Sequence, residues 1–197
     1  LRTSTFRCRK VSSEGPRSPE VVARPPDTCS DGRMSTTPDA LSPDDSRHLA
    51  ACIELAREAK ARGDHPIGSR LVSASGQVLR EDTNRAVTQN DPLAHPEYAL
   101  TRWALENLSD SEREGATLYT SVEHCPFCFG AAFYARLGRL VFAVSGAQLR
   151  PVRGDRVAAI GVSAHELAAA TIGRAMRVAG PDPSLSEPGL AVHLGHW

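Results

Sequence analysis

One short stretch, Ser121-Val-Glu-His-Cys-Pro-Phe-Cys, constrains this chain more than any other part of it. Its two cysteines, Cys125 and Cys128, are separated by two residues where a strand pattern gives way to a helix pattern. This spacing lets both thiolates bind one metal ion in the turn that enters a helix, where the helix dipole favours the thiolate form. Redox dithiols and structural zinc sites have the same spacing, so the cysteines alone leave three alternatives open.

A second stretch, His95-Pro96-Glu97, lies at the predicted start of a helix. Alone, such a histidine is most often a surface or capping residue, and such a glutamate compensates the helix dipole. About 200° separates them around an α-helix, but side chains of the first turn can converge beyond the helix end. Catalytic zinc takes three protein ligands and keeps a fourth position open. Taken with the two cysteines, His95 is predicted to be the third ligand and Glu97 a proton shuttle.

The composition narrows the classes of function. Residues 1–33 hold seven basic and four acidic residues, so residues 34–197 carry a net charge of −3, which is unfavourable for nucleic-acid binding. No apolar run approaches the roughly 18 residues of a membrane helix, and the N-terminus lacks the apolar core of a secretory signal. The odd number of cysteines, five, argues against a disulfide framework. We expect a cytoplasmic protein without membrane contact, with Cys52 in its core.

The order of patterns predicts one domain after a leader. Residues 1–41 are rich in Ser, Pro, Arg and Thr without periodicity, so we expect a disordered leader, with Met34 as an alternative start. Residues 42–197 are expected to form a single domain with a C-terminal tail. Its predicted helices and strands alternate, which indicates an α/β fold with an antiparallel hairpin first and parallel crossovers after it. Helices are predicted at 43–63, 95–108, 126–137 and after Ser163, and strands at 67–74, 77–83, 117–121, 140–144 and 176–179.

The pair of motifs, His95-Pro-Glu97 and Cys125-Pro-Phe-Cys128, resembles the zinc-dependent cytidine/deoxycytidylate deaminase superfamily, which carries H-x-E and P-C-x-x-C. The resemblance runs from about residue 66 to residue 144. It implies a three-layer α/β/α sandwich with a five-stranded mixed sheet, one Zn²⁺ per subunit, and Glu97 as the catalytic acid and base. It also implies a homodimer.

The segment Asn90-Asp-Pro-Leu-Ala-His95 is similar to the guanine deaminase and nucleoside deaminase branch of that superfamily. The expected reaction is therefore hydrolytic deamination of a purine-type base or nucleoside, with release of ammonia. Two alternatives remain. A tRNA adenosine deaminase would need a basic surface near its site. A glutaredoxin-like dithiol protein would need no zinc and would carry its cysteines after the first strand.

The resemblance also places the substrate contacts. Five residues are expected to hold or surround the substrate: Asn84, Ser121, Glu123, His124 and Phe127. His124 stands where the family has proline, and beside a ligand it can reshape the pocket, hydrogen bond to a ligand, or compete as one. Pro96 is the other departure, in place of a small residue.

The C-terminal aromatic cluster, His193, His196 and Trp197, has two interpretations. It packs on the domain surface, or it closes over the site as a lid, which the resemblance to guanine deaminase suggests. His65, beside Pro66, is expected to be a loop residue, with lining of the pocket as the alternative.

Overall fold

The computed structural model describes residues 39–154 and 157–197. Within these residues five strands form one sheet in the order β2-β1-β3-β4-β5. β1 pairs antiparallel with β2 and β3, whereas β3 with β4 and β4 with β5 are parallel. The mixed sheet predicted from the sequence is confirmed. The strands are β1 (Gly68–Val72), β2 (Val78–Thr83), β3 (Thr117–Val122), β4 (Arg139–Val144) and β5 (Arg177–Ala179).

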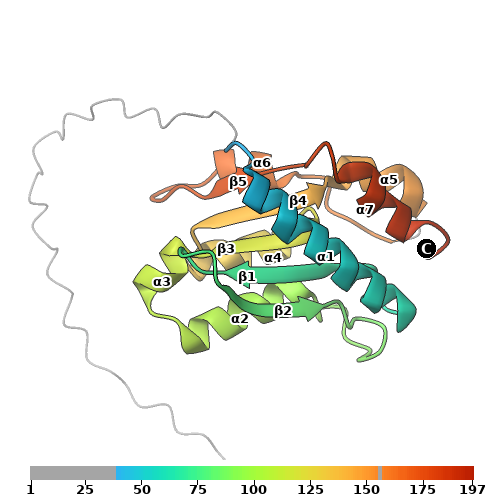
Figure 1. Cartoon of the computed structure of the whole chain (residues 1–197), viewed down its shortest axis with the longest axis horizontal. Helices are drawn as coiled ribbons and strands as arrows, with labels where there is room; N and C mark the ends of the chain where they lie inside the picture. The colour runs from blue at the N-terminus through green and yellow to red at the C-terminus, as the bar shows by residue number, and fades with distance from the viewer. Residues whose placement is uncertain (1–38, 155–156) are drawn as a thin grey trace, which may run out of the picture. The chain divides into compact units, whose positions relative to one another are not determined.

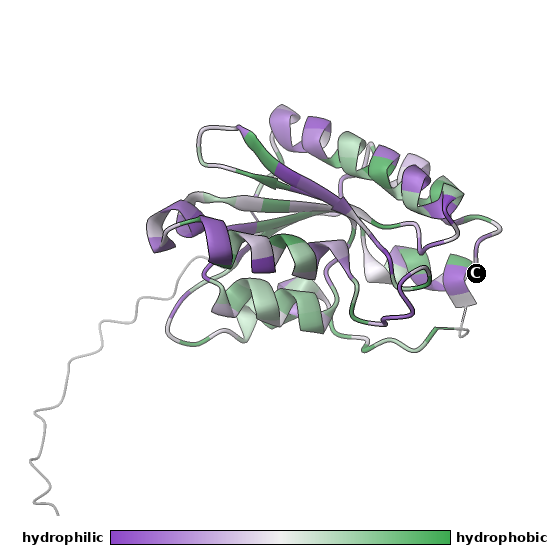
Figure 2. Ribbon diagram, turned by 90° about the horizontal axis from the view of Figure 1, so that it is seen from below, coloured by the Kyte–Doolittle hydropathy of each residue, from purple (hydrophilic) through white to green (hydrophobic). Residues whose placement is uncertain are grey.

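Helices cover both faces of this sheet, so the predicted three-layer sandwich is confirmed (Figure 1). α1 packs on one face, and α2 and α4 pack on the other, as the view along the sheet shows (Figure 2). α7 joins α1, and α6 joins α4. The helices are α1 (Pro43–Ala61), α2 (Pro96–Asn107), α3 (Asp110–Gly115), α4 (Pro126–Tyr134), α5 (Gly146–Arg153), α6 (Ala164–Ala169) and α7 (Ser186–His193).

Each face of the sheet has its own apolar core. On β4, Leu140 and Phe142 pack with residues of α2 and α4, while Val141 and Ala143 pack with residues of α1. All four side chains are fully buried. A strand that is covered on both faces has no solvent side, which explains why β4 is a continuous apolar run in the sequence.

The first helix begins as predicted. The Ser42 side chain accepts a hydrogen bond from the Asp45 backbone N–H, the Asp45 carboxylate accepts one from the Ser42 N–H, and Pro43 takes the first helical position. The predicted apolar stripe of α1 is buried against the sheet, and Cys52 lies within it with no exposed surface.

The structure corrects one helical boundary and adds two helices. α4 ends at Tyr134 and not near Leu137, because Arg136 adopts a positive φ of 65°, which an α-helix does not allow. α3 and α5 were not predicted. Each begins with a serine and a residue three positions later that hydrogen bond reciprocally, and this spacing is visible in the sequence at Ser109 and Ser145.

The sequence predicts a disordered leader over residues 1–41, with Met34 as an alternative start. Residues 1–38 of this leader, including Met34, lie outside the described residues. Its last three residues belong to the folded body, contrary to the expectation. The Asp39 carboxylate accepts a hydrogen bond from Arg139 at 2.5 Å, and Leu41 packs against the core of the α1 face. An ion pair and an apolar contact offset the entropy of ordering these residues. Among the helices described, none has the length and apolar character needed to cross a membrane.

Candidate active site

The two motifs meet at the starts of two helices. His95 is the residue before the first turn of α2, with an extended backbone, and its side chain makes no hydrogen bond that caps the helix. The capping interpretation of His95 is therefore wrong. Cys125 holds the same position on α4, directly beyond the end of β3, and its Sγ accepts a hydrogen bond from the Cys128 N–H at 3.5 Å. Both helices present their positive ends to the sulfurs.

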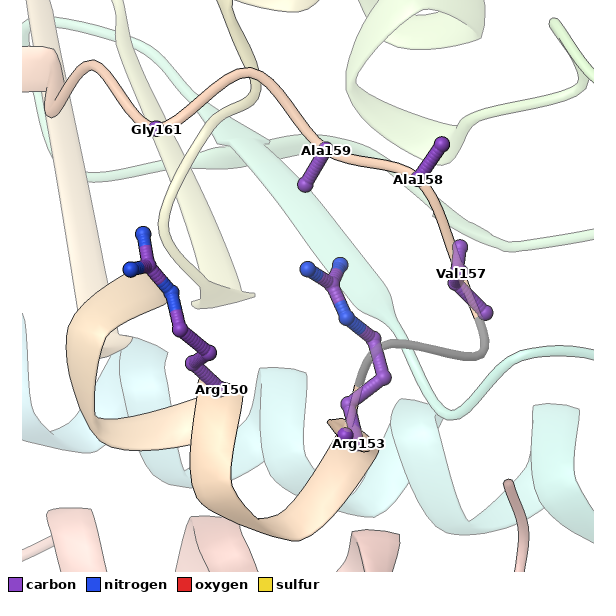
Figure 3. A pocket seen from close by; sticks show the side chains of 7 residues that line it. Arg150, Arg153, Val157, Ala158, Ala159 and Gly161 are labelled. Carbon is purple, nitrogen blue, oxygen red and sulfur yellow. The ribbon is translucent and has the colours of Figure 1, made fainter.

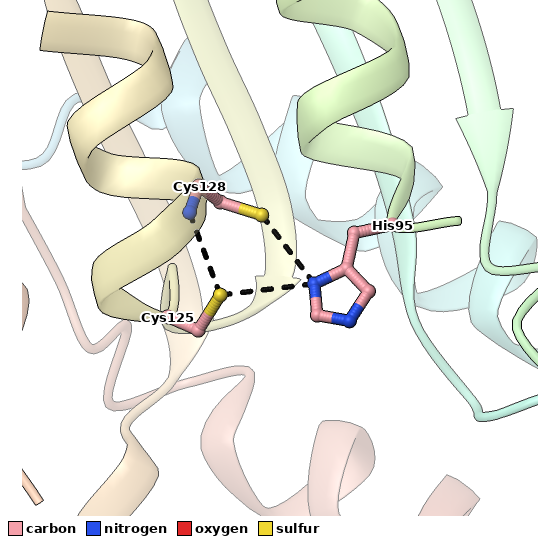
Figure 4. A group of neighbouring side chains, drawn as sticks. All are labelled: His95, Cys125 and Cys128. Atoms are coloured by element: carbon pink, nitrogen blue, oxygen red, sulfur yellow. Dashed lines mark hydrogen bonds between the residues drawn. The ribbon is translucent and has the colours of Figure 1, made fainter. Parts of the chain in front are cut away.

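The three predicted ligands form one cluster (Figure 4). The His95 Nδ1 lies 3.7 Å from the Cys125 Sγ and 3.4 Å from the Cys128 Sγ. Tetrahedral zinc, with Zn–N of about 2.0 Å and Zn–S of about 2.3 Å, separates a nitrogen from a sulfur ligand by about 3.6 Å. The distances and the donor set of one imidazole and two thiols both fit zinc.

The two thiols of the cluster do not ionise equally readily on their own. Hydrogen bonding by Cys128, with a further contribution from His95, lowers the pKa of Cys125 to about 4. The neighbouring Cys125 thiolate and burial raise the pKa of Cys128. Two thiolates side by side in a buried site repel each other, and a divalent cation between them removes that cost.

Glu97 is buried one position into the first turn of α2, where only 3% of its surface is exposed. Its Oε2 has no hydrogen-bond partner among the described residues. Burial raises the pKa of Glu97 to about 7, and the charges of His95 and Cys125 also act on it. A buried carboxyl with one oxygen unpaired among the described residues, beside a candidate metal-ligand set, is arranged for proton transfer.

Asn84 supplies a hydrogen-bond donor to the cavity that His95 and Glu97 also line. The residue is fully buried at the exit of β2, and its Oδ1 accepts a hydrogen bond from the Ala86 N–H at 2.9 Å. This bond fixes which end of the amide faces the protein. The Nδ2, in contrast, has no partner in the described part of the chain. An oriented donor without a partner suits an acceptor atom on a substrate.

Two of the other expected substrate contacts have structural partners. The Ser121 hydroxyl is buried in β3, accepts a hydrogen bond from the Gly68 N–H at 3.2 Å, and does not line the cavity. The Glu123 carboxylate lines the cavity and accepts hydrogen bonds from the backbone N–H of Gly146 and Ala164. It therefore joins the start of α5 to the start of α6.

His124 and Phe127 both line the cavity. His124 is 1% exposed, and neither of its ring nitrogens has a partner within the described residues. Burial alone lowers the pKa of His124 to about 3, so the ring is neutral. Phe127 is partly exposed and lies edge-on to His95, with ring centroids 6.3 Å apart.

All these residues except Ser121 and Cys128 line one cavity of about 820 Å³. This is in the upper part of the range of about 300–1,000 Å³ for ligand cavities. His65 and Trp197 also line it, with their rings stacked at 4.9 Å, so His65 is more than a loop residue. α5 and the segment after it form another part of the wall. Sequence reasoning missed that wall because it missed α5.

The fold and the sequence place this chain in the cytidine deaminase superfamily. The chain belongs to the MafB19-like deaminase family, whose sequence model matches residues 43–172. The redox alternative does not fit, because the dithiol follows β3 rather than the first strand and lies against His95.

Two curated relatives illustrate the sequence similarity. A tRNA-specific adenosine deaminase from Haemophilus influenzae is 35% identical over 101 residues, which are 51% of this chain and 58% of the relative. A guanine deaminase from Bacillus subtilis is 37% identical over 96 residues, which are 48% of this chain and 61% of the relative. The aligned part thus spans less than two thirds of either relative.

Solved structures agree on the fold. A guanine deaminase from Nitrosomonas europaea superposes with a TM-score of 0.62 over 80% of this chain and 86% of its own, at 22% identity. A tRNA:A34 deaminase superposes with a TM-score of 0.53 over 68% of this chain and 96% of its own, at 29% identity. Both substrate types occur among proteins that share this fold.

Proposed function

We propose that the protein is a zinc-dependent hydrolase that removes the amino group of a purine-type base or nucleoside and releases ammonia. The observation that carries the proposal is the buried Glu97 carboxyl, whose Oε2 lacks a partner among the described residues, beside the His95, Cys125 and Cys128 donor set. The Asn84 Nδ2 in the same cavity, which has no partner among the described residues, supports it.

The zinc ligands, Asn84 and Glu97 have different roles in the proposed reaction. His95, Cys125 and Cys128 would hold zinc, which would polarise a water for attack on the ring carbon. The Asn84 Nδ2 donates a hydrogen bond to a ring nitrogen or carbonyl oxygen and orients the ring. Glu97, with a pKa of about 7, takes a proton as the carbon–oxygen bond forms and gives one to the amino nitrogen as the carbon–nitrogen bond breaks. Water and the amine are consumed, and a carbonyl and ammonia are produced.

A purine-type ring is supported by the names of the relatives, which include a guanine deaminase and an adenosine deaminase. A probable cytosine deaminase from Schizosaccharomyces pombe is also similar, at 33% identity over 116 residues. Pyrimidines therefore belong in the test, as the competing ring class.

A tRNA adenosine deaminase is the second candidate, because 35% identity to the Haemophilus influenzae enzyme favours it. The net charge of −3 over residues 34–197 weighs against an RNA surface, since neutralising phosphates requires clustered Lys and Arg. A tRNA substrate is the arm of the test that decides between the two.

The test measures ammonia release from guanine, guanosine, adenine, adenosine, cytosine, cytidine and tRNA, together with the zinc content. Glu97→Gln is expected to keep about one zinc per chain and to lose about 10²–10⁴-fold in rate, because proton transfer contributes that much. Glu106→Gln, on the exposed side of the same helix, is the matched control and should have wild-type activity.

Two results would overturn the proposal. One is a purified protein that binds no zinc. The other is a Glu97→Gln variant with full activity on every accepted substrate. The proposal further includes a homodimer in the cytoplasm, which the resemblance to related deaminases supports, and sedimentation of the purified protein measures its oligomeric state.

A further inference from the structure

Two arginines of α5, Arg150 and Arg153, line the cavity that also contains Glu97 and Asn84. They are three residues apart and so lie on the same side of the helix. Figure 3 shows both side chains extending from α5 toward the segment that carries Ala159 and Gly161. The arginines and that segment enclose a smaller hollow of about 300 Å³ at one part of the cavity wall.

Arg150 and Arg153 differ in their partners from the other arginines of residues 39–154 and 157–197. Every other arginine there pairs with a carboxylate, bonds to a backbone carbonyl or lies over an aromatic ring. The partnered ones are Arg47, Arg57, Arg62, Arg70, Arg80, Arg85, Arg102, Arg113, Arg136, Arg139, Arg174 and Arg177. No ion pair or hydrogen bond joins Arg150 or Arg153 to any other residue in these two ranges.

The Arg153 Nε is also buried from solvent without a partner in that part of the chain. A buried donor that carries charge and lacks an acceptor destabilises the fold. Asp155 and Arg156, which follow Arg153 closely in the sequence, lie outside the described residues. A ligand with acceptor oxygens would remove the cost.

The opposite side of the hollow leaves room for such a ligand. It is formed by Val157, Ala158, Ala159 and Gly161, and none of the described residues that line the hollow carries a carboxylate. The Arg150 guanidinium comes within 3.1 Å of the place where a Cβ at Gly161 would stand, so only glycine admits it there without displacement. Small side chains and two guanidinium groups make a pocket for a compact anion.

We propose that Arg150 and Arg153 form a phosphate subsite, and that the substrate is a nucleoside monophosphate. The proposal rests on the proposed deaminase function, which it makes more specific. Guanidinium groups bind phosphate through paired N–H donors, and two of them balance the charge of a phosphate dianion. The base then reaches Asn84 and Glu97 within the same cavity. An RNA backbone would need a longer basic surface than one pair of arginines, on a body with a net charge of −3.

The test compares each accepted nucleoside with its 5′-monophosphate and with an RNA oligonucleotide that contains the same base, using the zinc-loaded protein. The wild type is expected to favour the monophosphate over the nucleoside by about 10- to 100-fold in kcat/KM, since charged hydrogen bonds are worth that factor. In Arg150→Ala/Arg153→Ala this ratio should fall to near one. Arg102→Ala, which removes a paired surface arginine of α2, is the control and should keep the wild-type ratio.

A binding measurement separates this proposal from the reaction itself. Calorimetry of the Glu97→Gln protein with inorganic phosphate and with nucleoside monophosphates should show binding that the double arginine variant loses and the Arg102→Ala variant keeps. Deamination without a monophosphate preference, together with no phosphate binding, would overturn the subsite and leave the deaminase function standing. Activity on the RNA alone would overturn the nucleotide assignment in favour of RNA. Phosphate binding without any deamination would support the subsite and contradict the proposed function.

Discussion

Among the residues of the site, His124 has the surroundings least like those of an ordinary core side chain. It is nearly fully buried, neutral, and has no hydrogen-bond partner for either nitrogen among the described residues. A buried polar group without a partner opposes folding, so its presence has to be explained by something other than stability. In the sequence it stands where the related deaminases have proline, and the structure places it in the cavity wall.

At this scale we predict that His124→Leu leaves the free energy of unfolding unchanged or raises it by up to about 1 kcal/mol, because it removes two unpaired polar atoms. Ser121→Ala is the contrasting variant. It leaves the buried Gly68 N–H without its acceptor and should cost about 1–3 kcal/mol. Urea denaturation of both purified variants measures the difference. A loss above about 2 kcal/mol in His124→Leu would show that the ring has a structural partner.

At the scale of elements, the contact between α1 and β1 positions the antiparallel edge of the sheet. Gly68, the first residue of β1, lies against α1 so closely that a Cβ there would come within 2.3 Å of the Leu55 Cβ and 2.6 Å of the Cys52 carbonyl oxygen. The loop that follows β2 begins at Asn84, whose backbone N–H donates to the Ile67 carbonyl. A shift of β1 therefore also displaces the Asn84 amide.

We predict that Gly68→Ala lowers the free energy of unfolding by about 2–4 kcal/mol, because helix backbone and strand backbone must separate to admit the methyl group. For a chain of this length that corresponds to a fall in Tm of about 5–15 °C. Gly130→Ala is the matched control. No atom lies within 4 Å of its added methyl group, and alanine is the better helix former, so its Tm should be equal or higher. Equal Tm values for the two variants would contradict the close approach.

At the scale of the whole molecule, a buried charge network ties the start of α1 to two central strands. The Asp45 carboxylate accepts hydrogen bonds from the Tyr119 hydroxyl at 2.7 Å and from Arg139 at 2.6 Å. The side chains of Asp45 and Arg139 are 3% and 11% exposed. Burial by itself raises the pKa of Asp45, but the Arg139 hydrogen bond, with those from Ser42 and Tyr119, outweighs it and holds the pKa at about 2.

This lowered pKa predicts how stability depends on pH. An aspartate has a pKa of about 3.9 when unfolded, so the network stabilises the fold by about 2 kcal/mol above that pH and loses the contribution as pH falls through about 2. Asp45→Asn should therefore be less stable than the wild type at pH 7, and the gap should narrow between about pH 4 and pH 2. Urea denaturation across this range measures it. A gap of constant size at every pH would refute the linkage.

Much of the fold could be predicted from local patterns. The apolar run of β4 and the capping residues of α1 report on nearest neighbours in the chain, so they are readable without a structure. The helix ends were harder to predict from the sequence. The end of α4 is an example, because the positive φ of Arg136 follows from how the chain must turn before β4. α5 was missed although Ser145 and Gln148 form a capping box, and Pro151 lies within it, where proline is unfavourable.

The sequence by itself predicted the donor set, because two cysteines and one histidine stand at helix starts with a spacing that suits one metal ion, and it predicted Glu97 beside them. Only the tertiary structure decided what surrounds that centre. The Ser121 hydroxyl hydrogen bonds within the sheet, and the Glu123 carboxylate accepts hydrogen bonds from two backbone N–H groups. Arg150 and Arg153 line the same cavity as Glu97. Ligand spacing is a local property of the chain, whereas a cavity wall is made by segments that meet only when the sheet and its covering helices have packed.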